Sequence, residues 1–278
     1  EGNAPKAYSR LYIEPDHVIE EPACDWRATI GGIFRPLVKD CATAREAVLT
    51  IAAHMTDATG VYYSTDRRTP FMNPLEALEE KKVSCSGQSI LMVCAFRSVG
   101  IPARAVMLPT WNHVEGNHTW CEAWFDGEWH MIEFNEKDFN TPWVMEGVGM
   151  LDPKKPEQHI YAIIDYKKDL AMDVTPRYAK LAAQWYASNG CPPDKQRIMV
   201  DFQPRGEEAE PVQLLDAEGK VLEEAALPTK GDDFRHFTTF DIPREGSFSL
   251  QLKGKTLPVN ATAAPVQVLK LTPETLPQ

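Results

Sequence analysis

An Asp126-Gly127 dipeptide constrains this chain more than any other feature of its sequence. It stands between two aromatic-rich runs, NHTWCEAWF and EWHMIEF. Asp-Gly between such runs is the sequence signal of a β-hairpin with a two-residue turn, and the turn also sets the register of the two strands. Because alternate residues of a strand share a face, His118 and Glu133 then lie on one face of the hairpin as diagonal neighbours, about 7–8 Å apart between backbones.

The preceding stretch, VSCSGQSILMVCAFRSVGIPAR, predicts a helix that begins at Cys85 and ends at Gly100. Ser84 is a good N-cap, and Gly-Ile-Pro is a helix stop. The Cys85 thiol would lie in the first turn, where unpaired N–H groups and the helix dipole favour an anion and lower the thiol pKa from its usual ~8.5. Cys94 and Cys121 are interpreted as small core hydrophobes.

Cys85, His118 and Glu133 together predict a thiol-based acyl transfer. In such sites a thiolate attacks a carbonyl carbon, an imidazole carries the proton, and a carboxylate orients the imidazole. The N–H groups at the helix start are placed to stabilise the oxyanion of the intermediate. Asn135, which the hairpin register sets opposite His118, and the neighbouring Glu136 are alternatives for the third role.

The first ~80 residues predict mainly helices. Thr43-Ala44-Arg45-Glu46 has the pattern of a capping box, and an apolar run at helical spacing follows it. ARAVMLPTW (103–111) predicts a strand. Thr175-Pro176 predicts a further helix, which stops at Asn189-Gly190.

Beyond Cys191-Pro-Pro the pattern changes to short runs with strand character, separated by turn residues. These runs are RIMVDFQP, PVQLLD, KVLEEA, FRHFTTFDI (234–242) and SFSLQL, and their spacing predicts a small β-sandwich. We therefore expect two domains, residues 1–195 and 196–278. The last ~20 residues predict either a trailing strand or a loose tail.

The net charge of −11 over 278 residues argues against nucleic-acid binding, because phosphate binding needs a basic surface. It also disfavours docking on an anionic membrane. No apolar run approaches the ~20 residues of a membrane span. The chain begins with Glu and shows no apolar targeting segment, so we expect either a removed leader or a trimmed start, and export to the periplasm, cell surface or medium.

The six cysteines form no CxxC pair, which argues against a redox motif or a zinc ribbon. For an exported protein, the pair to suspect of forming a disulfide is Cys24 with Cys41. His113, His118 and Cys121 could suggest a metal site, but the last two face opposite sides of a strand, so no zinc is expected. No metal or organic cofactor is implied. Trp111, in the approach to His118, and Trp120 are the candidate substrate-binding residues.

On these residues the chain resembles the transglutaminase-like superfamily. That family has a cysteine at a helix start with Gly-Ile-Pro-Ala-Arg 15 positions on, as Gly100 follows Cys85. It then has a histidine followed by Trp and Glu, an Asp-Gly hairpin, and an acidic residue 15 positions after the histidine, as Glu133 follows His118. The resemblance covers about residues 40–165. It implies the family's Cys-His-Asp triad at Cys85, His118 and Glu133, with Glu in place of Asp.

The resemblance implies an α+β fold, in which a helical N-terminal part packs on an antiparallel sheet in a papain/transglutaminase-like core. The segment around Cys85 looks most like bacterial secreted members, and the tail resembles the small β-sandwich modules that often follow such cores. The expected function is hydrolysis of a peptide or side-chain amide by a cysteine peptidase or amidase, with a protein or peptide as substrate. A protein-crosslinking transglutaminase and a non-catalytic binding scaffold are the alternatives. The oligomeric state stays open.

Overall fold

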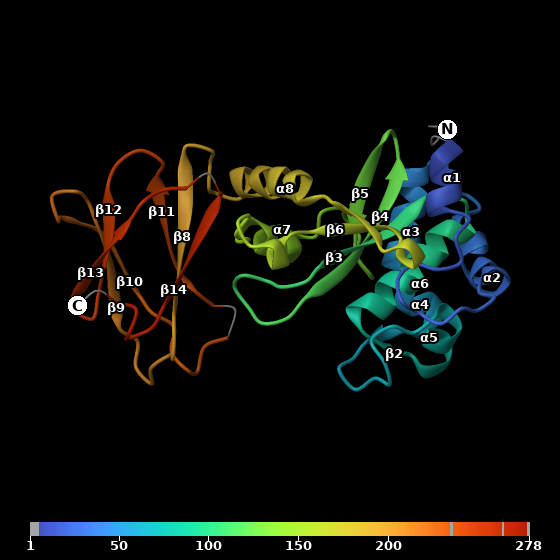
Figure 1. Ribbon diagram of the computed structural model, residues 1–278, viewed down its shortest axis with the longest axis horizontal. Coiled ribbons are helices and arrows are strands. Elements are labelled where there is room, and N and C mark those ends of the chain that lie inside the picture. The colour runs from blue at the N-terminus through green and yellow to red at the C-terminus, as the bar shows by residue number, and fades with distance from the viewer. Residues whose placement is uncertain (1–5, 234–235, 263, 277–278) are drawn as a thin grey trace. The chain divides into compact units, whose positions relative to one another are not determined.

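The computed structural model describes residues 6–233, 236–262 and 264–276, and the chain forms two compact units (Figure 1). The first unit comprises the chain up to Thr110, Gly116–Val144 and Pro153–Pro176. The second comprises Trp111–Glu115, Met145–Asp152 and Arg177–Gln278. The chain therefore passes between the units several times, and the helix predicted from Thr175 belongs largely to the second one. A domain boundary near residue 195 stays a prediction.

Helices make up most of the N-terminal part of the first unit, as the sequence predicts. They are α1 (Lys6–Tyr12), α2 (Arg27–Val38), α3 (Ala44–Ala53), α4 (Met55–Thr59), α5 (Pro74–Glu80) and α6 (Cys85–Ser98). Thr43 caps α3 by accepting the Glu46 N–H at 3.2 Å. The central helix is α6, which packs against α2, β3 and β4 and is buried along nearly its whole length.

The start of α6 is set by local interactions. The Ser84 hydroxyl accepts the Gly87 N–H at 2.9 Å and donates to the Pro70 carbonyl at 2.5 Å. This is the predicted N-cap, and it makes Cys85 the first residue of the helix. A Cβ at Gly87 would lie 2.9 Å from the Val83 Cβ, so glycine is needed for this close approach.

An antiparallel five-stranded sheet lies beside these helices, in the order β5-β4-β3-β6-β7 (Figure 1). Its strands are β3 (Ala103–Leu108), β4 (His118–Phe125), β5 (Glu128–Ile132), β6 (Tyr161–Asp165) and β7 (Leu170–Asp173). The predicted hairpin is confirmed: Phe125 pairs with Glu128, and both turn residues have positive φ, 50° at Asp126 and 87° at Gly127. A short parallel pair, β1 (Tyr62–Tyr63) and β2 (Lys82–Val83), leads into α6.

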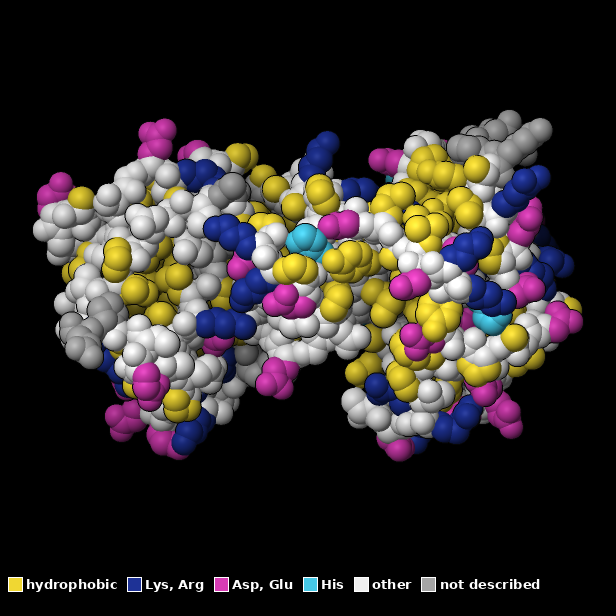
Figure 2. Space-filling model, viewed as in Figure 1, with side chains coloured by type: hydrophobic (Ala, Val, Ile, Leu, Met, Phe, Trp, Pro, Cys, Tyr) yellow, Lys and Arg dark blue, Asp and Glu magenta, His cyan; other side chains and the backbone are white. Residues whose placement is uncertain are grey.

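A buried ion pair stabilises the middle of this sheet. Arg104 of β3 and Glu122 of β4 face each other, with 2.7 Å between Nη2 and Oε2 and side chains that are 3% and 0% exposed. The Arg104 guanidinium also lies over the Trp129 ring, 4.0 Å from its centroid. Helix α1 adds Tyr8 and Tyr12 to this aromatic layer. Figure 2 shows hydrophobic side chains gathered on this face, around α1 and the hairpin.

The second unit contains α8 (Thr175–Ser188) and two sheets with a shared apolar core. One sheet has the order β10-β9-β12-β13 and the other β11-β8-β14. The strands are β8 (Lys195–Phe202), β9 (Pro211–Leu215), β10 (Val221–Ala226), β11 (Thr238–Pro243), β12 (Phe248–Leu252), β13 (Lys255–Val259) and β14 (Val266–Leu271). The sandwich expected from the short strand runs is present. Of the strand predicted over 234–242, residues 234 and 235 lie outside the described residues.

Two expectations need correction or completion. The tail contributes an ordered strand, because β14 pairs in parallel with β8. The disulfide suspected between Cys24 and Cys41 is absent, and all six cysteines are free. Cys41 instead lies 3.7 Å from the Thr50 hydroxyl.

Candidate active site

Cys85 lies in a polar environment at the N-terminus of α6. Burial alone would raise the pKa of its thiol, but a hydrogen bond with His118, the charge of that imidazole, and the backbone N–H groups of Thr119 and Ser86 outweigh burial and lower the pKa. A sulfur at a helix start that accepts backbone N–H groups carries thiolate character. The predicted environment of the thiol is therefore present.

His118 and Glu133 meet across the β4–β5 hairpin. His118 is the first residue of β4, and Glu133 directly follows the last residue of β5. The imidazole Nε2 hydrogen-bonds Glu133 Oε1, and the side chains are only 13% and 11% exposed. Burial lowers the pKa of His118, but the hydrogen bonds to Cys85 and Glu133 and the charges of both raise it to about 9. The three residues thus form one hydrogen-bonded series.

Of the two alternatives for the third position, Asn135 bonds a residue outside the site, and Glu136 lines the same cavity as Glu133. Asn135 has φ 64°, and its side chain accepts the Thr56 N–H at 3.0 Å and donates to the Thr56 hydroxyl at 2.8 Å. This holds its amide on the α4 side. Glu136 accompanies Glu133 at the cavity, and its backbone N–H donates to the Glu133 carbonyl at 3.2 Å.

A cavity of about 360 Å³ opens onto the three residues. Its other lining residues are Tyr63, Gln88, Asn117, Phe134, Glu136 and Trp143. Tyr63 is 54% exposed and Trp143 48% exposed, and the Trp143 ring centroid lies 4.6 Å from that of His118. Gln88 could have been found from the sequence, since it follows Cys85 by three positions on one helix face. Nothing local marks Tyr63 or Trp143, which come from distant segments.

The cavity wall is acidic. Among the described lining residues, Glu133 and Glu136 are carboxylates and none is Lys or Arg. Burial and the charges of Glu133 and Asp138 raise the pKa of Glu136. A cationic group that entered the cavity would be attracted to these carboxylates.

The two tryptophans predicted to bind substrate lie in different places. Trp120, 1% exposed, faces a void of about 20 Å³ behind Cys85 and His118, and its ring centroid lies 5.7 Å from that of His118. Trp111 is buried in the second unit, 5.4 Å from the His113 ring between centroids. Neither lines the larger cavity, and substrate binding by either stays a prediction.

The described residues contain no group of three or more His, Cys, Asp or Glu side chains that could hold a metal ion. Cys121 is buried and its Sγ donates to the Ser89 carbonyl at 3.3 Å. Burial lowers the pKa of His113 to about 4.

Within the described part of the chain, no helix combines the length and apolar character that crossing a membrane requires.

Comparison with known proteins gives one family. Residues 32–134 match the model of the transglutaminase-like superfamily, and no curated protein matches the chain. Among solved structures, the periplasmic domain of TgpA from Pseudomonas aeruginosa aligns at 17% identity over 41% of this chain and 45% of that one, with a TM-score of 0.31. Transglutaminase from red sea bream aligns at 12% identity over 92% and 63%, with a TM-score of 0.44. In both alignments the chain spans less than two thirds of the relative. Residues 32–134, which carry Cys85, His118 and Glu133, thus form a domain of the transglutaminase-like superfamily.

Proposed function

We propose that the protein is a thiol-dependent acyl-transfer enzyme that hydrolyses peptide or side-chain amides, with Cys85 as nucleophile, His118 as general base and acid, and Glu133 as the residue that orients His118. The single observation that carries this proposal is the hydrogen-bonded series from Cys85 through His118 to Glu133 at an open cavity. A scaffold without catalytic function would have no need to hold a thiol of lowered pKa beside a buried imidazole–carboxylate pair.

The reaction follows from the order of these groups. The Cys85 sulfur attacks the amide carbon, and the carbonyl oxygen becomes an oxyanion close to the N–H groups of the first turn of α6. The His118 imidazolium gives its proton to the leaving amine, the C–N bond breaks, and a thioester remains. A water molecule then loses a proton to His118 and attacks the thioester, which releases the carboxylic acid and restores the Cys85 thiolate.

Glu133 holds the imidazolium in place during both steps. It accepts the Nε2–H, so that Nδ1 is the ring nitrogen that remains for Cys85. Its hydrogen bond and negative charge also stabilise the charged form of His118, and together with the hydrogen bond and charge of Cys85 they raise the pKa of that imidazole. Glutamate is one methylene longer than the family's aspartate, and its position one residue past the end of β5 allows this reach.

One observation favours a primary amine as a second acyl acceptor beside water. The carboxylate of Glu136 and the exposed rings of Tyr63 and Trp143 at the cavity suit a primary amine, which would resolve the thioester by crosslinking. We propose hydrolysis as the main outcome because the cavity is open to water. Export of the chain and a protein or peptide substrate remain predictions.

The test uses mixed protein and peptide substrates that contain glutamine, with and without an added primary amine, followed by mass spectrometry. Hydrolysis gives new chain ends or deamidated glutamine, whereas crosslinking adds the mass of the amine. Cys85→Ala should lower either activity by at least about a thousandfold. The matched control is Cys41→Ala, since Cys41 is also half-buried but lies outside the cavity. Turnover that survives in the Cys85→Ala protein would refute the proposal.

A further inference from the structure

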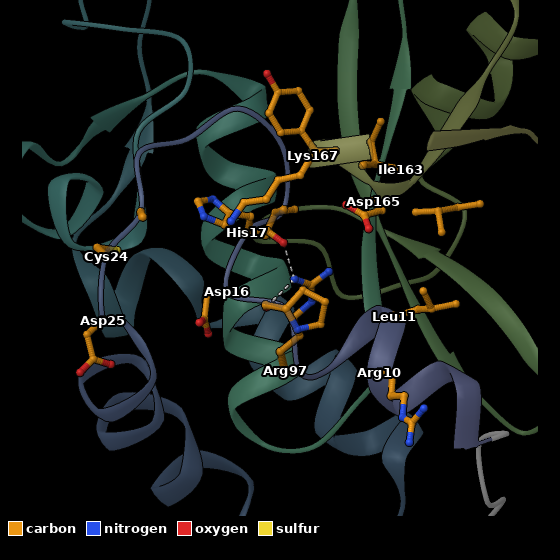
Figure 3. A pocket seen from close by; sticks show the side chains of 15 residues that line it. Arg10, Leu11, Asp16, His17, Cys24, Asp25, Arg97, Ile163, Asp165 and Lys167 are labelled. Atoms are coloured by element: carbon orange, nitrogen blue, oxygen red, sulfur yellow. Dashed lines mark hydrogen bonds between the residues drawn. The ribbon is translucent and has the colours of Figure 1, made fainter. Parts of the chain in front are cut away.

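The first unit has a second cavity, which shares no lining residue with the Cys85 cavity (Figure 3). It measures about 660 Å³, a size typical of sites for small organic ligands or short peptides. Residues 10–11, 15–18 and 23–25 form one part of its lining and residues 163–167 another, and Arg97 reaches it from the C-terminal end of α6. The mechanism proposed above uses none of these residues.

Arg97 is a buried cation that makes no ion pair with a carboxylate of the described residues. Its side chain is 5% exposed, yet all its hydrogen bonds go to neutral carbonyl oxygens. Nε and Nη2 donate to Ala103, and Nη1 donates to Pro15 at 3.0 Å and His17 at 2.8 Å (Figure 3). One N–H of Nη2 has no bond to any described residue.

The carbonyl groups solvate this guanidinium but do not neutralise it. Burial lowers the pKa of Arg97 to about 10, so the side chain stays charged at neutral pH. The buried Glu21 acts on it through space, while the Glu21 carboxylate itself accepts the N–H groups of Val18 and Ile19. A buried charge that lacks an ion pair is unfavourable, and an anion beside it would relieve that cost.

The cavity lining includes cations that make no ion pair, although it holds three cations and three carboxylates in all. Two of its carboxylates are already paired, Asp16 with Arg27 at 2.9 Å and Asp165 with Lys168 at 2.7 Å. Among the described lining residues, Arg10, Lys167 and Arg97 make no ion pair, whereas only Asp25 is an acid without one. Two further acids lie close by, because Glu20 bonds the lining Tyr166 and the buried Glu21 acts on Cys24 and Arg97. The inference therefore depends on the buried guanidinium of Arg97 and not on the net charge of the lining.

We infer that this cavity is a binding site for an apolar molecule that carries a carboxylate, the chemistry of a peptide with a free C-terminus and an aliphatic side chain. The carboxylate lies against Arg97 and within reach of Lys167, while the aliphatic part contacts the apolar wall. That wall consists of Leu11, Pro15, Val18, Ile163 and Ile164. This inference stands apart from the role of Cys85.

The test compares N-acetyl-Leu-Leu, which has a free carboxylate, with its C-terminal amide. Each is titrated by calorimetry into the full chain carrying Cys85→Ala, which prevents turnover of the probe. The acid should bind at least about tenfold more tightly than the amide, the difference a charge-assisted bond supplies. Inorganic phosphate is titrated as a second anion. Equal binding of acid and amide, no binding of either, or phosphate that binds as tightly as the acid would each overturn the inference.

Single charges on the rim supply variants that leave the fold intact. Lys167→Gln should weaken binding of the acid by roughly threefold, and Asp25→Asn should strengthen it by a similar factor. The matched control is Lys39→Gln, which removes the same charge from an exposed position that does not line the cavity. Changes of the same sign at Lys167 and Asp25, or an effect at Lys39 as large as at Lys167, would show that the acid does not bind in this cavity.

Discussion

The His118 imidazole and the Glu133 carboxylate are hydrogen-bonded and almost fully buried, although Glu133 lies just beyond the end of its strand. The hairpin register brings the two residues to the same face, and the chain turns away only after Glu133, at Asn135. The raised pKa of His118 therefore depends on two backbone features that keep Glu133 beside it, the hairpin register and the turn at Asn135.

The Cys85 thiol should react at a pH below that of a free thiol. Its pKa is lowered mainly by the hydrogen bond and charge of His118, so the rate of iodoacetamide alkylation should level off below the usual ~8.5. In His118→Ala the hydrogen bond and charge that lower the thiol pKa are lost. Burial of the sulfur should then raise the thiol pKa above the free value. Peptide mass spectrometry across pH measures both. An unchanged profile in His118→Ala would mean that the two residues do not interact.

Turnover should show a bell-shaped dependence on pH. The lower limb follows formation of the Cys85 thiolate, and the upper limb follows loss of the His118 proton, whose pKa is raised to about 9. Activity should therefore decline above about pH 9, because the leaving group no longer receives a proton. A profile that keeps rising beyond pH 10 would argue against His118 as the acid.

Replacing Glu133 should shift the upper limb. Glu133→Gln removes one of the charges that raise the pKa of His118 and leaves the effect of Cys85 in place, so the His118 titration should move to lower pH, and the activity should fall by at least about tenfold. Glu133→Asp keeps the charge on a shorter side chain. Its His118 titration and its activity should lie between those of the parent protein and those of Glu133→Gln. Nitrogen NMR of the His118 ring reads the titration without a substrate. Asn135→Ala is the control, because its amide bonds Thr56 instead.

Charged thiol reagents should sense the acidic cavity wall. A cationic methanethiosulfonate should modify Cys85 faster than an anionic one, and Glu136→Gln should reduce that ratio by roughly three- to tenfold at low salt. Asp138→Asn removes a nearby charge that does not line the cavity and should change the ratio less. If the wild-type protein reacts equally with both reagents, the carboxylates do not face the entering group.

The buried pair of Arg104 and Glu122 should be sensitive to removal of either partner. Glu122→Gln leaves an unpaired guanidinium in the sheet and should lower the free energy of unfolding by about 3–5 kcal/mol. The double variant Arg104→Met/Glu122→Leu should lose less, because no charge remains uncompensated. Urea denaturation of the three proteins measures this. A double variant that is less stable than Glu122→Gln would show that the pair itself is strongly stabilising.

Two glycines should respond in opposite directions to alanine. At Gly149 a Cβ would lie 2.2 Å from the Tyr186 ring, so Gly149→Ala should destabilise the second unit by about 1–3 kcal/mol. At Gly32, inside α2, a Cβ meets nothing within 4 Å, and Gly32→Ala should stabilise the first unit by about 0.5–1 kcal/mol. Calorimetric unfolding midpoints test both.

Local signals predicted the parts of the site that depend on neighbours in sequence. Ser84 caps α6 and places Cys85 at its start, and Asp126-Gly127 sets the hairpin register, because both are decided within a few residues. Strands β6 and β7 went unpredicted, since they are short and have no turn signal like Asp-Gly between them. The disulfide suspected between Cys24 and Cys41 rested on count alone, which says nothing of distance.

The sequence by itself determined that a thiol stands at a helix start and an imidazole on a hairpin, and it predicted that both belong to one transglutaminase-like domain, because caps, turns and strand register are local properties of the chain. Only the tertiary structure decided that Glu133 bonds His118 while Asn135 turns to Thr56, since that depends on a left-handed backbone at one residue and on the position of α4. It also decided that Tyr63 and Trp143 line the cavity, because packing brings together segments that have no local reason to meet.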